Sequence, residues 1–154
     1  MSYLIDTNIL LRSVDSNHAM NAEAISAVEN LLAAGETVNI FPQNISEFWN
    51  VATRPLDKNG LGLTPAQANT EVTKLENLLG LVLDAPQIYE EWRKLVVNYA
   101  VSGVNVHDAR LVAAMLVHGI SHILTFNAKD FRRFEPIVTV KTPTEIITEY
   151  SEDN

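Results

Sequence analysis

The sequence predicts an α/β fold, a three-layer α/β/α sandwich with a mostly parallel central sheet. Short apolar segments alternate with longer segments whose apolar residues recur at helical spacing, and this alternation is typical of parallel strands covered by helices on both faces. No internal repeat and no long linker interrupts the pattern. We therefore expect a single domain over residues 1–154, large enough to bury a core.

The first elements expected are a strand, a helix and a second strand. Residues 2–5 are short and apolar, which is typical of a buried strand. Between Met20 and Leu32 the apolar residues recur at helical spacing, and Gly35 follows as a helix terminator. Residues 37–41 are rich in strand-forming side chains and predict the second strand.

Proline residues mark the next boundaries. Pro42 is expected to close the strand before it, and Pro55 to end a helix whose apolar positions fall within residues 45–52. Thr64 is a suitable N-cap and is followed by proline, so a helix is expected over residues 65–79. The remaining expected strands are residues 81–83, 122–125 and 137–140, and the remaining expected helices run from Pro86 to near Gly103, over residues 106–117 before Gly119, and from Pro143 onward.

The composition indicates a globular protein and limits its partners. The chain is 47% hydrophobic and 19% charged, contains no cysteine and carries a formal net charge of −8. The lack of cysteine excludes disulfides and thiolate metal sites and suits the cytoplasm, and no apolar run is long enough for a membrane span. Because phosphate backbones favour basic surfaces, a short or structured nucleic acid fits this charge better than a long duplex.

Four acidic residues stand where strands end or helices begin: Asp6, Glu47, Asp108 and Asp130. Asp6 ends the first strand and Asp130 follows a late one, whereas the other two are expected in the first turns of helices. In a parallel sheet the functional crevice lies at the carboxyl ends of the strands, so the geometry allows these side chains to converge. Converging carboxylates repel one another and require a cation, for which Mg²⁺ or Mn²⁺ and phosphodiester hydrolysis are expected.

Helix capping is an alternative explanation for the same acids. Asn44, Asn105 and Asn127 each precede one of them by three residues, as in a capping box. Asp6 is similarly placed to cap a helical turn that starts at Thr7. The two explanations are compatible, because a capped helix holds a ligand rigidly.

The sequence around these acids resembles the PIN-domain family and, within it, the VapC-type toxins of bacterial toxin–antitoxin systems. The similar segments are the strand into Asp6-Thr7-Asn8, the helix start Asn44-Ile45-Ser46-Glu47, residues 107–114, residues 123–131 and the stretch from Ala52 to Leu63. Their order and spacing extend over nearly the whole chain. The chain departs from the family pattern at Asn127, where many members carry an acid, so the number of bound ions stays open.

The resemblance implies a PIN-like fold and a Mg²⁺- or Mn²⁺-dependent endoribonuclease, the toxin of a toxin–antitoxin pair. It further implies a cognate antitoxin protein and a homodimer as partners. The residues implied are Asp6, Glu47 and Asp108 as catalytic acids, Asp6 and Asp108 as metal ligands, and Thr7, Asn8, Asn127 and Asp130 as supporting groups. Arg12 and Arg110 are expected either to contact substrate phosphate or to form surface salt bridges.

Other functions are compatible with the same residues. One is a PIN-like module that has lost catalysis and binds a partner, and another is a structure-specific DNA nuclease of the same superfamily. A phosphotransfer protein, such as a receiver domain or an aspartate-nucleophile phosphatase, is disfavoured because those folds pair two acids near the first strand, where Asp6 stands alone. The histidines lack zinc-type spacing and are expected to be structural or surface residues, namely His18, His107, His118 and His122.

Overall fold

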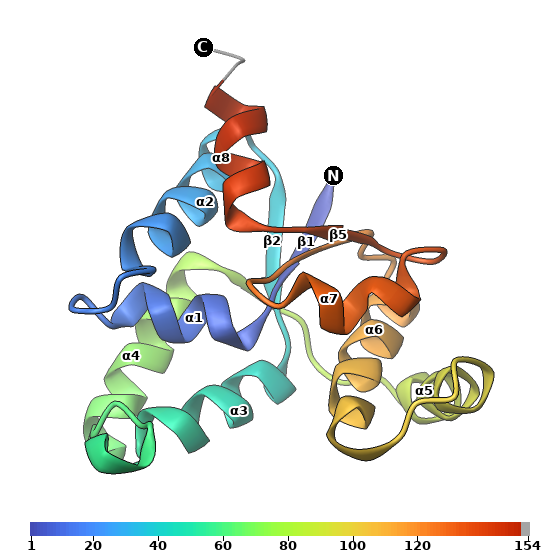
Figure 1. Cartoon of the computed structure of the whole chain (residues 1–154), viewed down its shortest axis with the longest axis horizontal. Helices are drawn as coiled ribbons and strands as arrows, with labels where there is room; N and C mark the ends of the chain where they lie inside the picture. The colour runs from blue at the N-terminus through green and yellow to red at the C-terminus, as the bar shows by residue number, and fades with distance from the viewer. Residues whose placement is uncertain (152–154) are drawn as a thin grey trace.

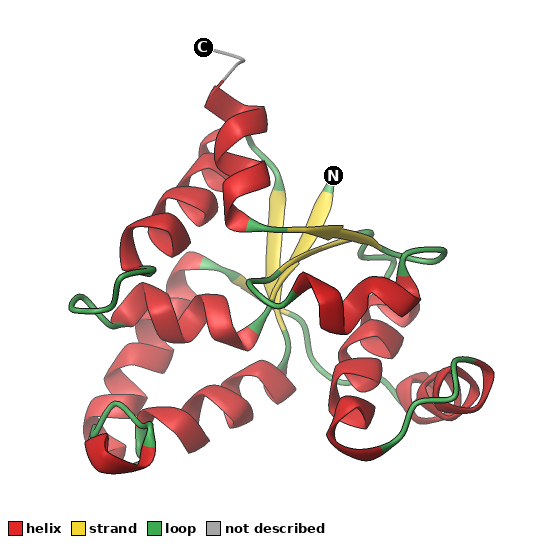
Figure 2. Cartoon of the chain, viewed as in Figure 1, coloured by secondary structure: helices red, strands yellow, loops and turns green. Residues whose placement is uncertain are grey.

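The computed structural model describes residues 1–151 and contains a five-stranded sheet in the order β3-β2-β1-β4-β5, with every neighbouring pair parallel. The strands are β1 Ser2–Ile5, β2 Thr37–Ile40, β3 Gly80–Leu81, β4 His122–Leu124 and β5 Thr139–Lys141. Figure 2 shows them in yellow at the centre of the molecule. The predicted α/β class is confirmed, and the sheet is parallel throughout its described strands.

Helices surround this sheet (Figure 1). They are α1 Thr7–Val14, α2 Asn21–Ala33, α3 Pro42–Ala52, α4 Pro65–Leu78, α5 Gln87–Asn98, α6 Val106–His118, α7 Ala128–Phe131 and α8 Pro143–Ser151. Short 3₁₀ turns are η1 Leu56–Lys58, η2 Gly103–Asn105 and η3 Arg132–Phe134. Among residues 1–151, no helix combines the length and the apolar character that crossing a membrane requires.

The three layers follow from the alternation of side chains along the central strands. Tyr3 and Ile5 of β1 pack in a core formed with α1, α2, α3, α4 and α8. Leu4, between them, packs in a second core with α5, α6 and α7. Leu124 and Ile123 of β4 divide between the two cores in the same way. Because successive strand residues point to opposite faces, a nearly continuous apolar run supplies both cores.

Most helix ends lie where local signals predicted them. The Thr64 hydroxyl accepts a hydrogen bond from the Gln67 backbone N–H at 3.1 Å and caps α4. Gly119 ends α6 in the left-handed conformation, with φ of 68°, which a residue without a side chain adopts at little cost. The main differences are at short elements: β3 and β5 are shifted from their predicted ranges, and α5 ends at Asn98.

One boundary error changes the position of a candidate site residue. Pro42 was expected to close β2 but is the first residue of α3, a position at which proline's missing N–H costs nothing. The side chain of Asn44 accepts a hydrogen bond from the Phe41 N–H at 2.8 Å and so stabilises this earlier start. The prediction that Glu47 lies in the first helical turn is therefore wrong, since it lies one turn further along.

The strand order places the carboxyl ends of β1 and β4 side by side at the point where the chain reverses direction across the sheet. From β1 the chain adds β2 and β3 on one side, and β4 then returns to pair with the other side of β1. Such a reversal leaves a crevice beyond the strand ends. Residues that follow β1 and β4 therefore share one location.

Candidate active site

A cavity of about 870 Å³ is lined by residues that follow β1 and β4 and by residues of α3 and α6. All four acids singled out in the sequence line it: Asp6, Glu47, Asp108 and Asp130. The other predicted residues that line it are Thr7, Asn8, Asn127 and Arg110. Arg12 is not among its lining residues, so the structure does not place this predicted phosphate contact at the cavity.

Asp6 is held rigidly at the end of β1. It is only 7% exposed, and its Oδ1 accepts a hydrogen bond from the Thr7 N–H at 2.8 Å, which caps α1. Its Oδ2 accepts from the Thr125 hydroxyl at 2.7 Å and from Asn8 Nδ2 at 3.3 Å. The capping alternative is therefore correct for Asp6, and the same carboxylate also faces the cavity.

A buried polar network fixes the elements around Asp6. Asn8 Oδ1 accepts from the Phe126 N–H at 3.2 Å, joining the start of α1 to the segment after β4. The Thr7 hydroxyl accepts from Asn44 Nδ2 at 3.3 Å and joins α1 to α3. Because these groups satisfy one another away from water, they order the strand ends that carry the acids.

Glu47 is connected to α6 through Gln43. Gln43 Nε2 donates to Glu47 Oε1 at 2.9 Å and to the His107 carbonyl at 2.8 Å, while its Oε1 accepts from Arg110 Nη1 at 3.0 Å. Arg110 also forms an ion pair with Asp84 at 3.6 Å. One amide thus positions a candidate catalytic acid and a guanidinium on facing helices.

The capping-box explanation fails for the other three acids. Asn44 is the third residue of α3 and bonds the backbone before the helix rather than capping Glu47's turn. Asn105 and Asn127 precede α6 and α7, but neither side chain makes a capping hydrogen bond. The carboxylates of Asp108 and Asp130 therefore have no capping role within residues 1–151.

Burial disfavours ionisation of Asp6, Asp108 and Glu47 by raising their pKa values, and neighbouring carboxylates add to this effect at Asp6 and Asp108. Burial raises the pKa of Asp6 to about 6, although hydrogen bonds from Thr125 and Thr7 act in the opposite direction. Burial raises the pKa of Asp108 to about 7, and the neighbouring carboxylates act in the same direction. Burial also raises the pKa of Glu47, against the opposing effects of the Gln43 hydrogen bond and His107. The cavity thus concentrates negative charge at a cost in stability.

The donor set fits a divalent cation. Within residues 1–151 none of the four acids forms an ion pair with a lysine, arginine or histidine. In the same part of the chain no three histidine or acidic side chains are already close enough to enclose an ion. Mg²⁺ suits such an open arrangement, because it keeps several waters and binds only one or two carboxylates directly. Asp6 and Asp108 are the residues that would hold it.

The raised pKa values predict that the metal-free protein loses stability as pH rises. Between about pH 4 and pH 7 the folded state binds more protons at Asp6 and Asp108 than the unfolded state does, so the free energy of unfolding falls across this window. Chemical denaturation at pH 5 and pH 7.5 measures this fall. Asp108→Asn should make this fall in the free energy of unfolding smaller by about 1–3 kcal/mol. The value is limited to this range because water screens a partly exposed carboxylate.

Magnesium provides the control for this pH effect. A cation at the site favours the ionised carboxylates, so saturating Mg²⁺ should restore stability at pH 7.5 and change it little at pH 5. An identical pH dependence in the parent protein and Asp108→Asn would contradict the assignment.

Several residues that line the cavity, and Thr125, which holds Asp6 by a hydrogen bond, were not predicted as site residues. Thr125 could have been found from its position directly after β4, where a buried hydroxyl needs a partner. Gln43 and Asn50 share a helical spacing with Glu47 that places them on one face of α3, and Arg54 continues this spacing just past the helix end. His107, expected to be structural or a surface residue, is exposed and also lines the cavity.

The PIN domain family model matches residues 3–135 of this chain. No curated protein sequence matches this chain. Among solved structures, the chain resembles VapBC-1 from nontypeable Haemophilus influenzae, with 15% identity and a TM-score of 0.68 over 94% of this chain and 99% of that one. It also resembles VapC20 from Mycobacterium tuberculosis, a sarcin-ricin-loop-cleaving toxin, with 16% identity and a TM-score of 0.64 over 85% and 94% of the two chains. A toxin–antitoxin complex from Klebsiella pneumoniae matches with 22% identity and a TM-score of 0.63 over 92% and 98%. At these identities the likeness shows a shared fold.

Proposed function

We propose that this chain, which belongs to the PIN-domain family, is a Mg²⁺- or Mn²⁺-dependent endoribonuclease. The observation that carries the proposal is that Asp6, Glu47, Asp108 and Asp130 all line one cavity and have no basic ion-pair partner among residues 1–151. One buried and three half-buried carboxylates that line the same cavity repel one another, and a cation would offset this repulsion. Carboxylate sites that bind divalent ions are suited to phosphodiester hydrolysis.

Each acid has a separate part in the proposed reaction. A divalent ion held by Asp6 and Asp108 would stabilise negative charge on the reacting phosphate. Asp6 is kept in place by its hydrogen bonds to Thr7 and Thr125. Glu47, whose pKa is raised by burial, accepts the proton of the attacking water as a general base. Asp130 and Asn127 complete the wall of the cavity.

RNA is the proposed substrate, and an antitoxin is the proposed partner. The structural neighbours include a toxin that cleaves the sarcin-ricin loop and a toxin–antitoxin complex. A second cavity of about 200 Å³ between α1, α2 and α4 would accept apolar side chains of an antitoxin, and it is lined by Ile9, Leu10, Val14, Ile25, Leu75 and Leu78 among others. We further propose a homodimer that acts in the cytoplasm, where a chain without cysteine is suited to reducing conditions.

A cleavage assay tests the enzymatic part of this proposal. Single-stranded and stem–loop RNA, with DNA of the same sequences, are incubated with the protein in Mg²⁺, in Mn²⁺ or in excess chelator. We expect RNA cleavage in both metals and none in chelator. Equal cleavage in chelator would contradict the metal mechanism, and cleavage confined to DNA would identify a DNA nuclease. A metal-dependent rise in thermal stability without cleavage of either substrate would identify a non-catalytic binding module.

A further inference from the structure

One face of α3 lines the cavity along its whole length and continues past the end of the helix. The lining residues on this face are Gln43, Ser46, Glu47, Asn50, Val51 and Arg54. Eleven residues at helical rise extend about 16 Å, enough for a short stretch of single-stranded nucleic acid. Chemical character changes along the face: the acid Glu47 lies near the middle of the helix, the neutral polar side chain of Asn50 follows it, and the cation Arg54 lies just past the helix end.

The two guanidiniums that line the cavity are in different situations. Arg110 already donates to Gln43 Oε1 at 3.0 Å and pairs with Asp84 at 3.6 Å. For Arg54, no ion pair and no side-chain hydrogen bond is formed with residues 1–151. Arg54 is also only half-buried, so its charge faces the cavity and solvent. It is therefore the guanidinium with free donors for a ligand.

The connection between α3 and α4 holds the Arg54 backbone in place. The Arg54 N–H donates to the Val51 carbonyl at 3.2 Å, and its carbonyl accepts from the Gly62 N–H at 2.8 Å. Gly60 packs against Arg54 so closely that a Cβ at position 60 would lie 2.1 Å from the Arg54 carbonyl oxygen. Only glycine fits against this backbone. The loop thus fixes the position of the Arg54 backbone, so less conformational entropy is lost when the arginine binds a ligand.

We propose that Arg54 binds a backbone phosphate of the RNA at a position removed from the cleaved bond, and that Asn50 lines the path of the strand between Glu47 and Arg54. This inference rests on the proposed ribonuclease function. A guanidinium binds a phosphate through two parallel N–H groups, which gives both orientation and affinity. Glu47, about two turns before Arg54 on the same face, lines the cavity together with the other acids where cleavage is proposed, so one strand passes from the acids to the arginine.

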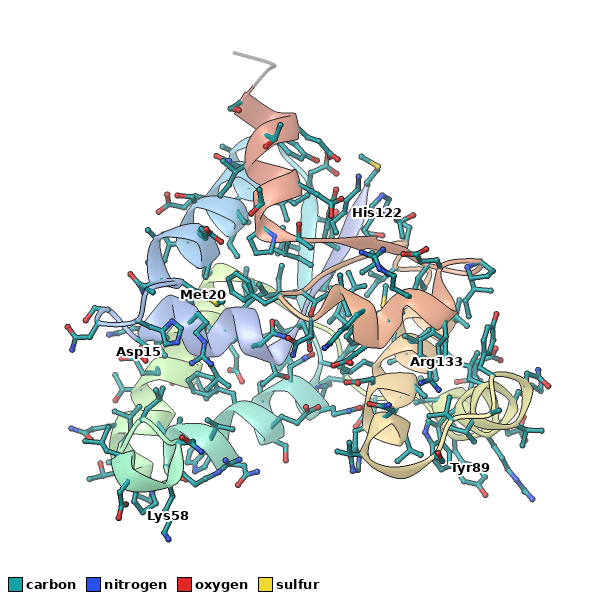
Figure 3. All side chains as sticks on the ribbon, viewed as in Figure 1. Asp15, Met20, Lys58, Tyr89, His122 and Arg133 are labelled. Carbon is teal, nitrogen blue, oxygen red and sulfur yellow. The ribbon has the colours of Figure 1, made fainter. Side chains whose placement is uncertain are left out.

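The test compares Arg54→Gln and Arg54→Lys with a matched control, Lys58→Gln. Lys58 lies in η1 of the same loop, is exposed and does not line the cavity, and Figure 3 shows it at the outer edge of the molecule. Steady-state cleavage gives kcat and KM for each protein. Binding of a fluorescent single-stranded RNA is measured at several salt concentrations with each change placed in an Asp108→Asn protein, so that the RNA stays intact.

We expect Arg54→Gln to raise KM and Kd about tenfold, the loss of one charge-assisted contact, and to change kcat less than about twofold. The slope of log Kd against log salt should fall by about 0.7, the value for one phosphate on a single strand. Arg54→Lys should keep the slope and lose less affinity, because it retains the charge without the planar fork. Lys58→Gln should match the parent protein.

Two results would overturn the inference alone. One is an unchanged KM and salt slope in Arg54→Gln while the parent protein cleaves RNA normally. The other is a fall in kcat at constant KM, which would place Arg54 at the reacting phosphate instead. If the parent protein neither binds nor cleaves RNA in Mg²⁺ or Mn²⁺, the proposed function fails and this inference fails with it.

Discussion

Replacing Asp108 by asparagine is expected to abolish RNA cleavage while making the metal-free protein more stable. Asp108 is proposed to hold the divalent ion, and its loss should lower kcat/KM at least about 100-fold, because charge stabilisation at the phosphate is worth several kcal/mol. Its carboxylate makes no hydrogen bond within residues 1–151 and is destabilised by burial and by neighbouring carboxylates, which raise its pKa to about 7. An amide of the same size removes this repulsion without leaving a partner unsatisfied.

Cleavage and unfolding measurements on the same protein test both halves of this prediction. In chelator at pH 7.5, the free energy of unfolding should rise by about 1–3 kcal/mol relative to the parent protein. Addition of Mg²⁺ should stabilise the parent but not the variant. A variant that is both inactive and less stable would indicate that Asp108 supports the fold rather than the reaction.

Asp6→Asn is the informative comparison, because the two acids have different surroundings. The oxygens of Asp6 accept hydrogen bonds from Thr7, Asn8 and Thr125. An asparagine there would turn an NH₂ group toward these donors. We therefore expect Asp6→Asn to lose cleavage as well but to gain less stability than Asp108→Asn, or none.

Replacing Thr125 by valine is expected to destabilise the protein by about 2–4 kcal/mol, because it removes a hydrogen bond to a carboxylate and leaves buried polar groups unpaired. Thr125 is fully buried, and its hydroxyl donates to Asp6 Oδ2 at 2.7 Å. The Thr125 hydroxyl oxygen also accepts a hydrogen bond from Asn8 Nδ2 at 3.2 Å and another from the Asn127 N–H at 3.0 Å. Valine has nearly the same shape, so the loss reports the polar contacts rather than a cavity.

The same substitution should move the pH dependence of cleavage. The hydrogen bond from Thr125 lowers the pKa of Asp6 against the effect of burial, so its removal raises that pKa further. Because the ionised carboxylate is the proposed metal ligand, the acid limb of the pH–rate profile should shift to higher pH.

Thr125→Ser is the matched control for the valine variant. It keeps the hydroxyl and loses one methyl group, at a cost of about 1 kcal/mol. It should retain the pH profile of the parent protein. Equal pH profiles in the serine and valine variants would contradict the role assigned to the hydroxyl.

The helix ends that were predicted correctly are those that depend on residues close by in the sequence. Thr64 caps α4 through Gln67, and Gly119 ends α6 through its own backbone conformation. Pro42 was misassigned because proline suits both the end of a strand and the first turn of a helix. Its true role depends on the bond between Asn44 and the Phe41 N–H, which stabilises the earlier helix start.

The site residues also fall into those found from the sequence and those found only from the structure. The acids were visible because each stands at the edge of an apolar segment, where a charge requires an explanation. Arg12 and Arg54 were not distinguishable by such a criterion, since both are arginines in or next to helices that follow strands. Within the α3–α4 connection, Gly60 packs against the Arg54 backbone, and Arg54 lines the cavity, whereas Arg12 does not.

By itself the amino-acid sequence determined the α/β class, the alternation of strands and helices and the positions of four acids at the edges of apolar segments, because these follow from periodicity, capping and residue type over short distances. Only the tertiary structure decided the order of the strands, the gathering of the acids around one cavity and the placement of Arg54, rather than Arg12, at that cavity. Those features depend on which faces of distant elements pack together, and the free energy of that packing belongs to the whole core rather than to any local segment.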